Sequence, residues 1–238
     1  HLKEVGSPLV KFIASLRSAA IVVDLIIHTQ TPKKISNEPL KLVNVYFDAP
    51  LTMDAIGFSG PESEEFAKRL IHLAQSSGAV TLFPAHYIEE IQTNIGVMLS
   101  KDPRERRGPT AQAIRRGEIN EEIIRLKIEN LTGEIKRLGL RIDESLPDHE
   151  ARSGFDEDHK QAVFAALQSQ MPHAALDRDI VTVAGILGRR GGRRSRQIGD
   201  CRAIFVTRNP LLAGRVNRHL RESFGYVEQH VPLFLYST

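Results

Sequence analysis

The sequence predicts an α/β domain with a mainly parallel central sheet. Three short segments are apolar and β-rich without polar alternation, at residues 42–47, 79–83 and 201–207. Such runs are typical of strands that are covered on both faces, as in a parallel sheet. Amphipathic helical segments lie between them, and alternating strands and helices are the pattern of an α/β domain.

Each of the first two strands is expected to be followed by a helix. The segment 61–77 opens with Pro61, which suits a first helical turn, and has acidic residues where the helix end is positive. Gly78 ends this helix. A second helix is expected to open at Pro84 and to extend to Leu99.

Residues 101–150 are expected to form a helical insertion. Residues 101–117 are polar and rich in arginine, which indicates an exposed loop, and residues 120–138 have the spacing of one amphipathic helix. The remaining elements are predicted as helices at 154–171, 175–190 and 211–225 and a last edge strand within 231–238.

The first part of the chain is predicted to be separate from this domain. The polar segment 28–39 contains two prolines and is typical of a linker. Since the first residue is His, we expect residues 1–41 to be an N-terminal appendage and linker that end a missing upstream region. The domain itself is expected to span residues 42–238.

Composition limits the class of protein. The 238 residues are 41% hydrophobic and 26% charged. These proportions fit one large globular domain or a domain with an appendage. The single cysteine, Cys201, excludes an internal disulfide and favours a reducing, cytoplasmic location. No apolar stretch reaches the ~18 residues that a membrane span needs, so we expect no membrane association. The net charge of +3 is too small to indicate a partner by itself.

Polar residues follow the predicted strands. Ligands of open parallel sheets bind at the carboxyl ends of the strands, so these residues are candidates for one site. Taken singly, each has a structural interpretation as a turn, a helix cap or a solvated side chain. Together they would repel one another unless a cation neutralised them, and a hard divalent ion such as Mg²⁺ or Mn²⁺ prefers oxygen ligands. The candidates are Asp48, Glu89, Glu90, Asp177, Asp179, Thr207 and Asn209.

An arginine-rich segment is the second candidate feature. It reads GRRGGRRSRQ, at residues 188–197. A charge run of this kind is usually a solvated loop, but it also suits an arm that binds phosphates without sequence preference. Its arginines are Arg189, Arg190, Arg193, Arg194 and Arg196.

The order of these motifs resembles the PIN-like domains of metal-dependent nucleases. The segment VYFDAPLTMDAIGFSG is similar to the start of a bacterial PIN-like subgroup, and FPAHYIEEI is similar to its F-H-x-x-E segment. The segments LDRDIVTVAGILGRRGG and IFVTRNPLLA resemble its D-x-D helix with a basic loop and its FVTxNxxLA strand and turn. The likeness extends from about Val43 to the C-terminus, apart from the insertion.

The resemblance implies a fold, an activity and roles for these residues. The fold would be a three-layer sandwich, and the activity would be hydrolysis of phosphodiester bonds, in RNA rather than DNA, by water that Mg²⁺ or Mn²⁺ activates. Asp48 would be the central metal ligand, and Glu90, rather than Glu89, would join it with Asp177 or Asp179. Asn209, backed by Thr207, would hold a ligand water or the substrate, and Glu89 would support the site. The arginine segment would bind nucleic acid.

Two departures from the family pattern keep an alternative open. Ala49 stands where a hydroxyl residue is usual, and Asn209 stands where many PIN domains carry a fourth Asp. The alternative is a PIN-like module with weak or no catalysis that binds nucleic acid or a protein. Toprim and haloacid-dehalogenase folds fit less well, because neither accounts for Asp48 within Asp48-Ala49-Pro50. A homodimer and the upstream domain are both open as partners.

Overall fold

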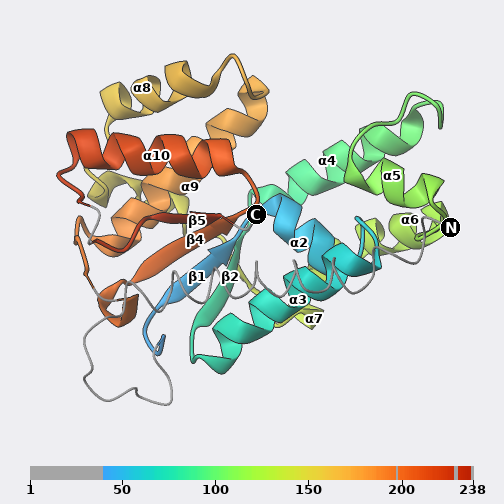
Figure 1. Cartoon of the computed structure of the whole chain (residues 1–238), viewed down its shortest axis with the longest axis horizontal. Coiled ribbons are helices and arrows are strands. Elements are labelled where there is room, and N and C mark those ends of the chain that lie inside the picture. The colour runs from blue at the N-terminus through green and yellow to red at the C-terminus, as the bar shows by residue number, and fades with distance from the viewer. Residues whose placement is uncertain (1–39, 197, 228–229, 237–238) are drawn as a thin grey trace, which may run out of the picture.

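A computed structural model describes residues 40–196, 198–227 and 230–236. Predictions for residues 1–39 lie outside these ranges. The described residues form a five-stranded sheet in the order β3-β2-β1-β4-β5, in which all neighbouring strands are parallel (Figure 1). This confirms the predicted α/β class and parallel sheet. The strands are β1 (Asn44–Phe47), β2 (Val80–Pro84), β3 (Arg141–Asp143), β4 (Ala203–Thr207) and β5 (Phe234–Tyr236).

Helices lie on both sides of the sheet, which is compatible with a three-layer sandwich. In Figure 1, α8 (Glu157–Leu167), α9 (His173–Arg190) and α10 (Pro210–Ser223) lie on one side of the strands. On the other side lie α3 (Pro61–Ser76) and α7 (Leu131–Arg137). None of the helices in the described ranges is long and apolar enough to cross a membrane.

The core is centred on β1 and β4. Every residue of β4 is buried, and so are Val45, Tyr46 and Phe47 of β1. In register, Val45 is aligned with Thr81 of β2 on one side and with Ile204 of β4 on the other. Strands buried on both faces are necessarily almost wholly apolar, which is why these two were predictable.

The chain after β1 turns directly into a helix, which the sequence analysis missed. Asp48 caps α2 (Ala49–Ile56), and its side chain accepts a hydrogen bond from the backbone N–H of Leu51. Pro50 is the second residue of this helix, in the first turn, where a backbone N–H would have no partner within the helix, so proline loses no hydrogen bond there. The Ala49-Pro50 step therefore starts a helix.

The segment 101–150 is only partly helical, and it contributes a strand to the central sheet. The predicted helix 120–138 is two helices, α6 (Glu121–Glu129) and α7, because Asn130 has a non-helical backbone at φ −113° and ψ 35°. Strand β3 follows α7 and pairs with β2. The expected exposed loop contains α5 (Pro109–Arg115).

The helix that was expected to open at Pro84 begins later. Pro84 is the last residue of β2, and α4 (Tyr87–Ser100) begins three residues after it. The backbone N–H of Ala85 continues the pairing with β3, because it donates to the carbonyl oxygen of Asp143 at 3.0 Å. The proline therefore ends a strand, where it needs no N–H of its own for the ladder.

A short 3₁₀ helix, η1 (Pro147–Arg152), packs tightly on α9. A side chain at Gly188 would collide with the backbone of His149, and one at Gly185 would crowd the carbonyl oxygen of Leu146. The second short helix, η2 (Ile198–Asp200), precedes β4. Glycines on one face of α9 thus allow the chain after β3 to lie against this helix.

Candidate active site

Asp48 lies at the point where the direction of strand connection reverses. The chain leaves β1 toward β2 and β3, and later returns to β4 on the other side of β1. In open parallel sheets, ligands bind at the carboxyl ends of the strands at such a switch point. Asp48 follows β1 directly, and Thr207 is the last residue of β4.

Three protein groups fix the carboxylate of Asp48. Its Oδ1 accepts from the backbone N–H of Leu51 at 2.7 Å. Its Oδ2 accepts from the hydroxyl of Thr207 at 2.6 Å and from the backbone N–H of Arg208 at 2.8 Å. Burial raises the pKa of Asp48 to about 6, in spite of these hydrogen bonds, which favour the charged form. The charge of Asp54 raises this pKa further.

Asp179 is a second carboxyl group near Asp48, and it is half-buried. It lies on α9, and its Oδ1 accepts from the hydroxyl of Tyr87 at 2.7 Å. Burial raises its pKa to about 7; the Tyr87 hydrogen bond opposes this, and the charges of Asp48 and Glu90 add to it. The structure therefore places Asp179 within electrostatic reach of both Asp48 and Glu90.

Glu90 lies on the first turn of α4 and is bound to an arginine. The Nε of Arg178 donates to Glu90 Oε2 at 2.9 Å. Burial raises the pKa of Glu90, while the positive charge of Arg178 lowers it. Arg178 also lowers the pKa of Asp179, so the charge of one guanidinium group stabilises the ionised form of two of the three acids. Sequence reasoning missed Arg178, although it stands between Asp177 and Asp179.

The other two predicted acids are not part of this group. Asp177 is exposed, and residues two apart on a helix point to different sides, so it diverges from Asp179. Glu89 is exposed as well, next to the half-buried Glu90. Both residues are solvated acids near the start of a helix, which is the structural interpretation that the sequence also allowed.

Asn209 is a helix cap. Its side-chain oxygen accepts from the backbone N–H of Leu212 at 3.1 Å, at the start of α10. Its amide nitrogen donates to the sulfur of Met171 at 3.4 Å. Thr207 in turn accepts from the backbone N–H of Asn209 at 2.9 Å and donates to Asp48. Thr207 thus holds the carboxylate of Asp48, and both polar atoms of the Asn209 side chain are bound to other parts of the protein.

A chain of hydrogen bonds lies behind Asp179. The Nε2 of His86 is 2.9 Å from the hydroxyl of Thr182, which lies 3.0 Å from the hydroxyl of Tyr87. Burial, with the nearby charge of Arg178, lowers the pKa of His86 to about 4, so this imidazole is neutral at pH 7. The chain fixes the orientation of Asp179. His86 and Tyr87 stand inside the motif that suggested Glu90, but Thr182 carried no sequence signal.

A second ion pair flanks Asp48. Asp54 of α2 is buried and pairs with Arg208, the residue that follows β4. Burial raises the pKa of Asp54, against the effects of Ser59 and Arg208. Arg178 and Arg208, both partly exposed, thus form ion pairs with Glu90 and Asp54. Within the described ranges, Asp48 and Asp179 have no ion-pair partner.

The carboxylates of this site suit a hard divalent cation, but the set of ligands for such a cation is incomplete. In residues 40–196, 198–227 and 230–236, no group of three or more His, Cys, Asp or Glu side chains is placed to hold a metal ion. Asp48 and Asp179 supply two carboxylates of the kind that Mg²⁺ and Mn²⁺ prefer. Glu90 could be the third only after it releases Arg178.

The arginine segment lies away from these acids. Asp179 is in the second turn of α9, and Arg190 is its last residue. At the rise of an α-helix, this stretch alone separates them by roughly 16 Å. Arg190 is buried and donates to the carbonyl oxygens of Ala203, Val231 and Pro232 at 2.7, 2.9 and 2.6 Å. The prediction that Arg190 binds nucleic acid is therefore wrong, because its donors hold the strand ends together.

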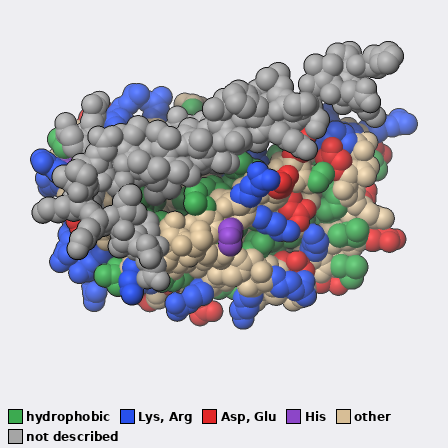
Figure 2. Space-filling view, turned by 60° about the horizontal axis from the view of Figure 1, so that its bottom comes forward, with side chains coloured by type: hydrophobic (Ala, Val, Ile, Leu, Met, Phe, Trp, Pro, Cys, Tyr) green, Lys and Arg blue, Asp and Glu red, His purple; other side chains and the backbone are tan. Residues whose placement is uncertain are grey.

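Arg189 is also bound to other residues of the protein. Its Nη2 donates to Asp143 at 2.9 Å and to Ser145 at 2.8 Å, next to Tyr46, whose hydroxyl donates to the same carboxylate. The other three arginines of the segment, at positions 193, 194 and 196, are exposed. The face in Figure 2 shows Lys and Arg side chains spread over its left, lower and right parts, with most of the visible acids on the right.

No protein-family model, curated protein or solved structure matches this chain. Conclusions about function therefore rest on the site residues themselves.

Proposed function

We propose that this protein is a nuclease that hydrolyses phosphodiester bonds with the help of Mg²⁺ or Mn²⁺, in RNA rather than DNA. One observation carries the proposal: the carboxyl groups of Asp48 and Asp179 lie within electrostatic reach of each other at the switch point of a parallel sheet, with no cation of their own among the described residues. The likeness of the motif order to PIN-like nucleases supports the activity and the preference for RNA.

The chain's own residues would hold the two carboxylates in fixed orientations. Thr207 and the backbone N–H of Arg208 hold Asp48 in one orientation, and Tyr87 does the same for Asp179. Without a metal ion the pKa of Asp179 is about 7, and a bound divalent cation would favour its charged form. A bound divalent cation would neutralise the two carboxylates and lower the pKa of a coordinated water.

The two flanking arginines suit a phosphodiester substrate. The side chains of Arg178 and Arg208 are 34% and 39% exposed, so both can reach a bound phosphate group. Guanidinium groups bind phosphate oxygens in a bidentate manner. If Arg178 moved from Glu90 to a substrate phosphate, it would at the same time free Glu90 to act as a third carboxylate at the cation.

The ion pair between Arg178 and Glu90 also favours a second candidate. If Arg178 stays on Glu90, the site keeps only two carboxylates for a cation, and the chain would be a PIN-like module that binds nucleic acid or a protein with little or no hydrolysis. The two functions differ in whether cleavage depends on Asp48 and Asp179.

The test is a cleavage assay with labelled single-stranded RNA and DNA in Mn²⁺. Asp48→Asn and Asp179→Asn should each reduce the rate by about 100-fold or more, because each removes a charge from the reacting centre. Asp177→Asn is the matched control, since this exposed acid lies two residues away on the same helix, and it should keep wild-type activity. Equal cleavage by all four proteins would indicate a contaminating nuclease and contradict the proposal.

A further inference from the structure

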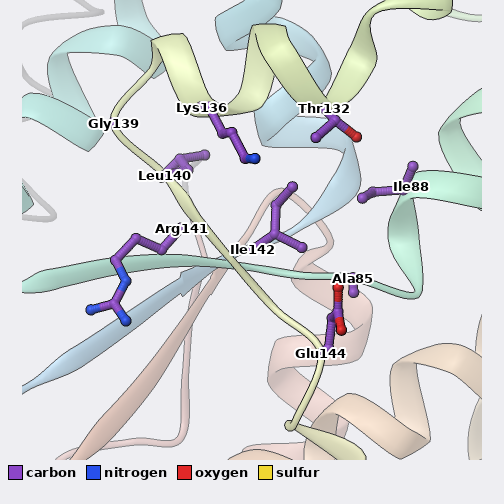
Figure 3. Close-up of a pocket in the computed structure, with 9 residues that line it drawn as sticks. All are labelled: Ala85, Ile88, Thr132, Lys136, Gly139, Leu140, Arg141, Ile142 and Glu144. Atoms are coloured by element: carbon purple, nitrogen blue, oxygen red, sulfur yellow. The ribbon is translucent and has the colours of Figure 1, made fainter.

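A hollow of about 650 Å³ lies along the outer edge of the sheet, between α7, β3 and the turn from β2 into α4. It is separate from the acidic site, and its volume is typical of pockets that hold one small ligand. Figure 3 shows its lining residues: Ala85, Ile88, Thr132, Lys136, Gly139, Leu140, Arg141, Ile142 and Glu144.

The hollow has an apolar floor with one lysine over it. In Figure 3, Lys136 and Ile142 point toward each other, and Thr132 points toward Ile88 across the same space. Lys136 is exposed and has no hydrogen-bond or ion-pair partner within the described ranges. An unpaired ammonium group above apolar side chains suits a ligand that has both a flat apolar part and an anionic group.

The two ends of the hollow differ in charge. Arg141 lies at the start of β3 and points away from Lys136 in Figure 3, and it too has no ion-pair partner in the described part of the chain. Glu144 follows β3 and lies near Ala85. The ammonium group of Lys136 therefore attracts an anion, and the end near Glu144 repels one.

The hollow reaches the edge of the sheet that carries the candidate active site. Ala85 directly follows β2 and is hydrogen-bonded to Asp143 at the end of β3. Ile88 is adjacent in sequence to Tyr87, which binds Asp179, and lies two residues before Glu90. The hollow and the acids thus share the carboxyl edge of the sheet, although Ile88 and Glu90, two residues apart on α4, point to different sides of this helix.

We infer that this hollow binds one nucleotide of a single-stranded polynucleotide whose neighbouring nucleotides extend along the carboxyl edge of the sheet to Asp48 and Asp179. The inference rests on the proposed function. The base would lie on Ile88, Leu140 and Ile142, and a backbone phosphate would contact Lys136. A base paired and stacked in a duplex cannot enter such a hollow, so the ligand is an unpaired strand.

Binding of a labelled single-stranded 12-mer RNA in EDTA, followed by fluorescence anisotropy, tests the inference without cleavage. Lys136→Glu should weaken binding about tenfold and reduce the slope of log affinity against log salt by about 1, as for a lost phosphate contact. Thr132→Trp keeps the charge but fills the hollow, and it should weaken binding of the single strand without affecting a duplex. Circular dichroism checks that both variants fold.

Lys101→Glu is the matched control, because it makes the same charge change at an exposed lysine beyond the far end of α4. It should alter affinity less than twofold. Wild-type affinity in both Lys136→Glu and Thr132→Trp would overturn the inference, and so would an equal loss in Lys101→Glu.

The inference and the proposed function can fail separately. In Mn²⁺, Lys136→Glu should raise KM for RNA cleavage about tenfold and leave kcat within about twofold. If the wild type cleaves RNA and Lys136→Glu has an unchanged KM, the nuclease proposal stands and the hollow does not bind substrate. If no cleavage occurs but RNA binding still depends on Lys136 and Thr132, the hollow binds the strand and the nuclease proposal fails.

Discussion

The ionised form of Asp179 should cost this protein stability, and replacing it with Asn should remove that cost. In the folded protein the pKa of Asp179 is about 7, against 3.8 for an unperturbed carboxyl group. Each pKa unit is worth about 1.36 kcal/mol, so a rise of about three units corresponds to about 4 kcal/mol at pH 8. Asn at this position still offers an oxygen to the hydroxyl of Tyr87.

The sign follows from proton binding. Between pH 4 and 7 the folded state binds more protons at Asp179 than the unfolded state does, so the free energy of unfolding falls as pH rises through this range. At pH 8 in EDTA, Asp179→Asn should therefore raise Tm, by up to roughly 8 to 16 °C for a domain of this size. At pH 5 the difference should shrink to less than half, because the unfolded chain then gains less by ionising this group.

Thermal unfolding of both proteins at pH 5 and pH 8, followed by circular dichroism, measures this difference. Asp177→Asn serves as the control because its side chain is exposed. As a surface substitution, it should change the free energy of unfolding by less than about 0.5 kcal/mol. A lower Tm for Asp179→Asn at pH 8, or the same gain at both pH values, would refute the reasoning that burial near Asp48 raises the pKa of this acid.

Two further predictions concern the arginine segment. In Arg190→Met, three carbonyl oxygens lose their donors. This substitution should lower the free energy of unfolding by about 3 kcal/mol or more in urea titrations; a loss no larger than that of the exposed Arg193→Met would contradict this. Arg193→Ala/Arg194→Ala should weaken RNA binding and reduce the salt slope by up to about 2, if both side chains contact phosphates. A slope that stays at the wild-type value would show that they do not.

Much of the fold could be predicted because its central strands are continuous apolar runs. Strands β1 and β4 are buried on both faces, so their sequences contain no polar alternation. Strand β3 has only three residues, two of them charged, and it pairs with β2 alone among the described strands. A strand that short carries no periodic signal, and only the tertiary structure shows that residues 101–150 enter the sheet.

The sequence singled out Asp48, Glu90 and Asp179 as candidate acids, but it did not distinguish them from the exposed Glu89 and Asp177, and it did not predict their partners. Asp48 and Thr207 meet because the carboxyl ends of parallel neighbours share one edge of the sheet. That Glu90 is bound to Arg178 depends on how α4 and α9 face each other, which no spacing in the sequence encodes.

The arginine segment was misplaced for a similar reason. Sequence order puts it close to Asp179, but the length of α9 carries it to the opposite end of the helix. Burial of Arg190 could not be read from composition either, because its partners are backbone carbonyl groups from β4 and the segment before β5.

The central claim is that Asp48 and Asp179 together bind a divalent cation. Calorimetric titration with Mn²⁺ at pH 7.5 tests it most directly, on the wild type, Asp48→Asn and Asp177→Asn. We predict saturable binding to the wild type and to Asp177→Asn, and none to Asp48→Asn. Absence of binding to the wild type, or equal binding to Asp48→Asn, would contradict the claim.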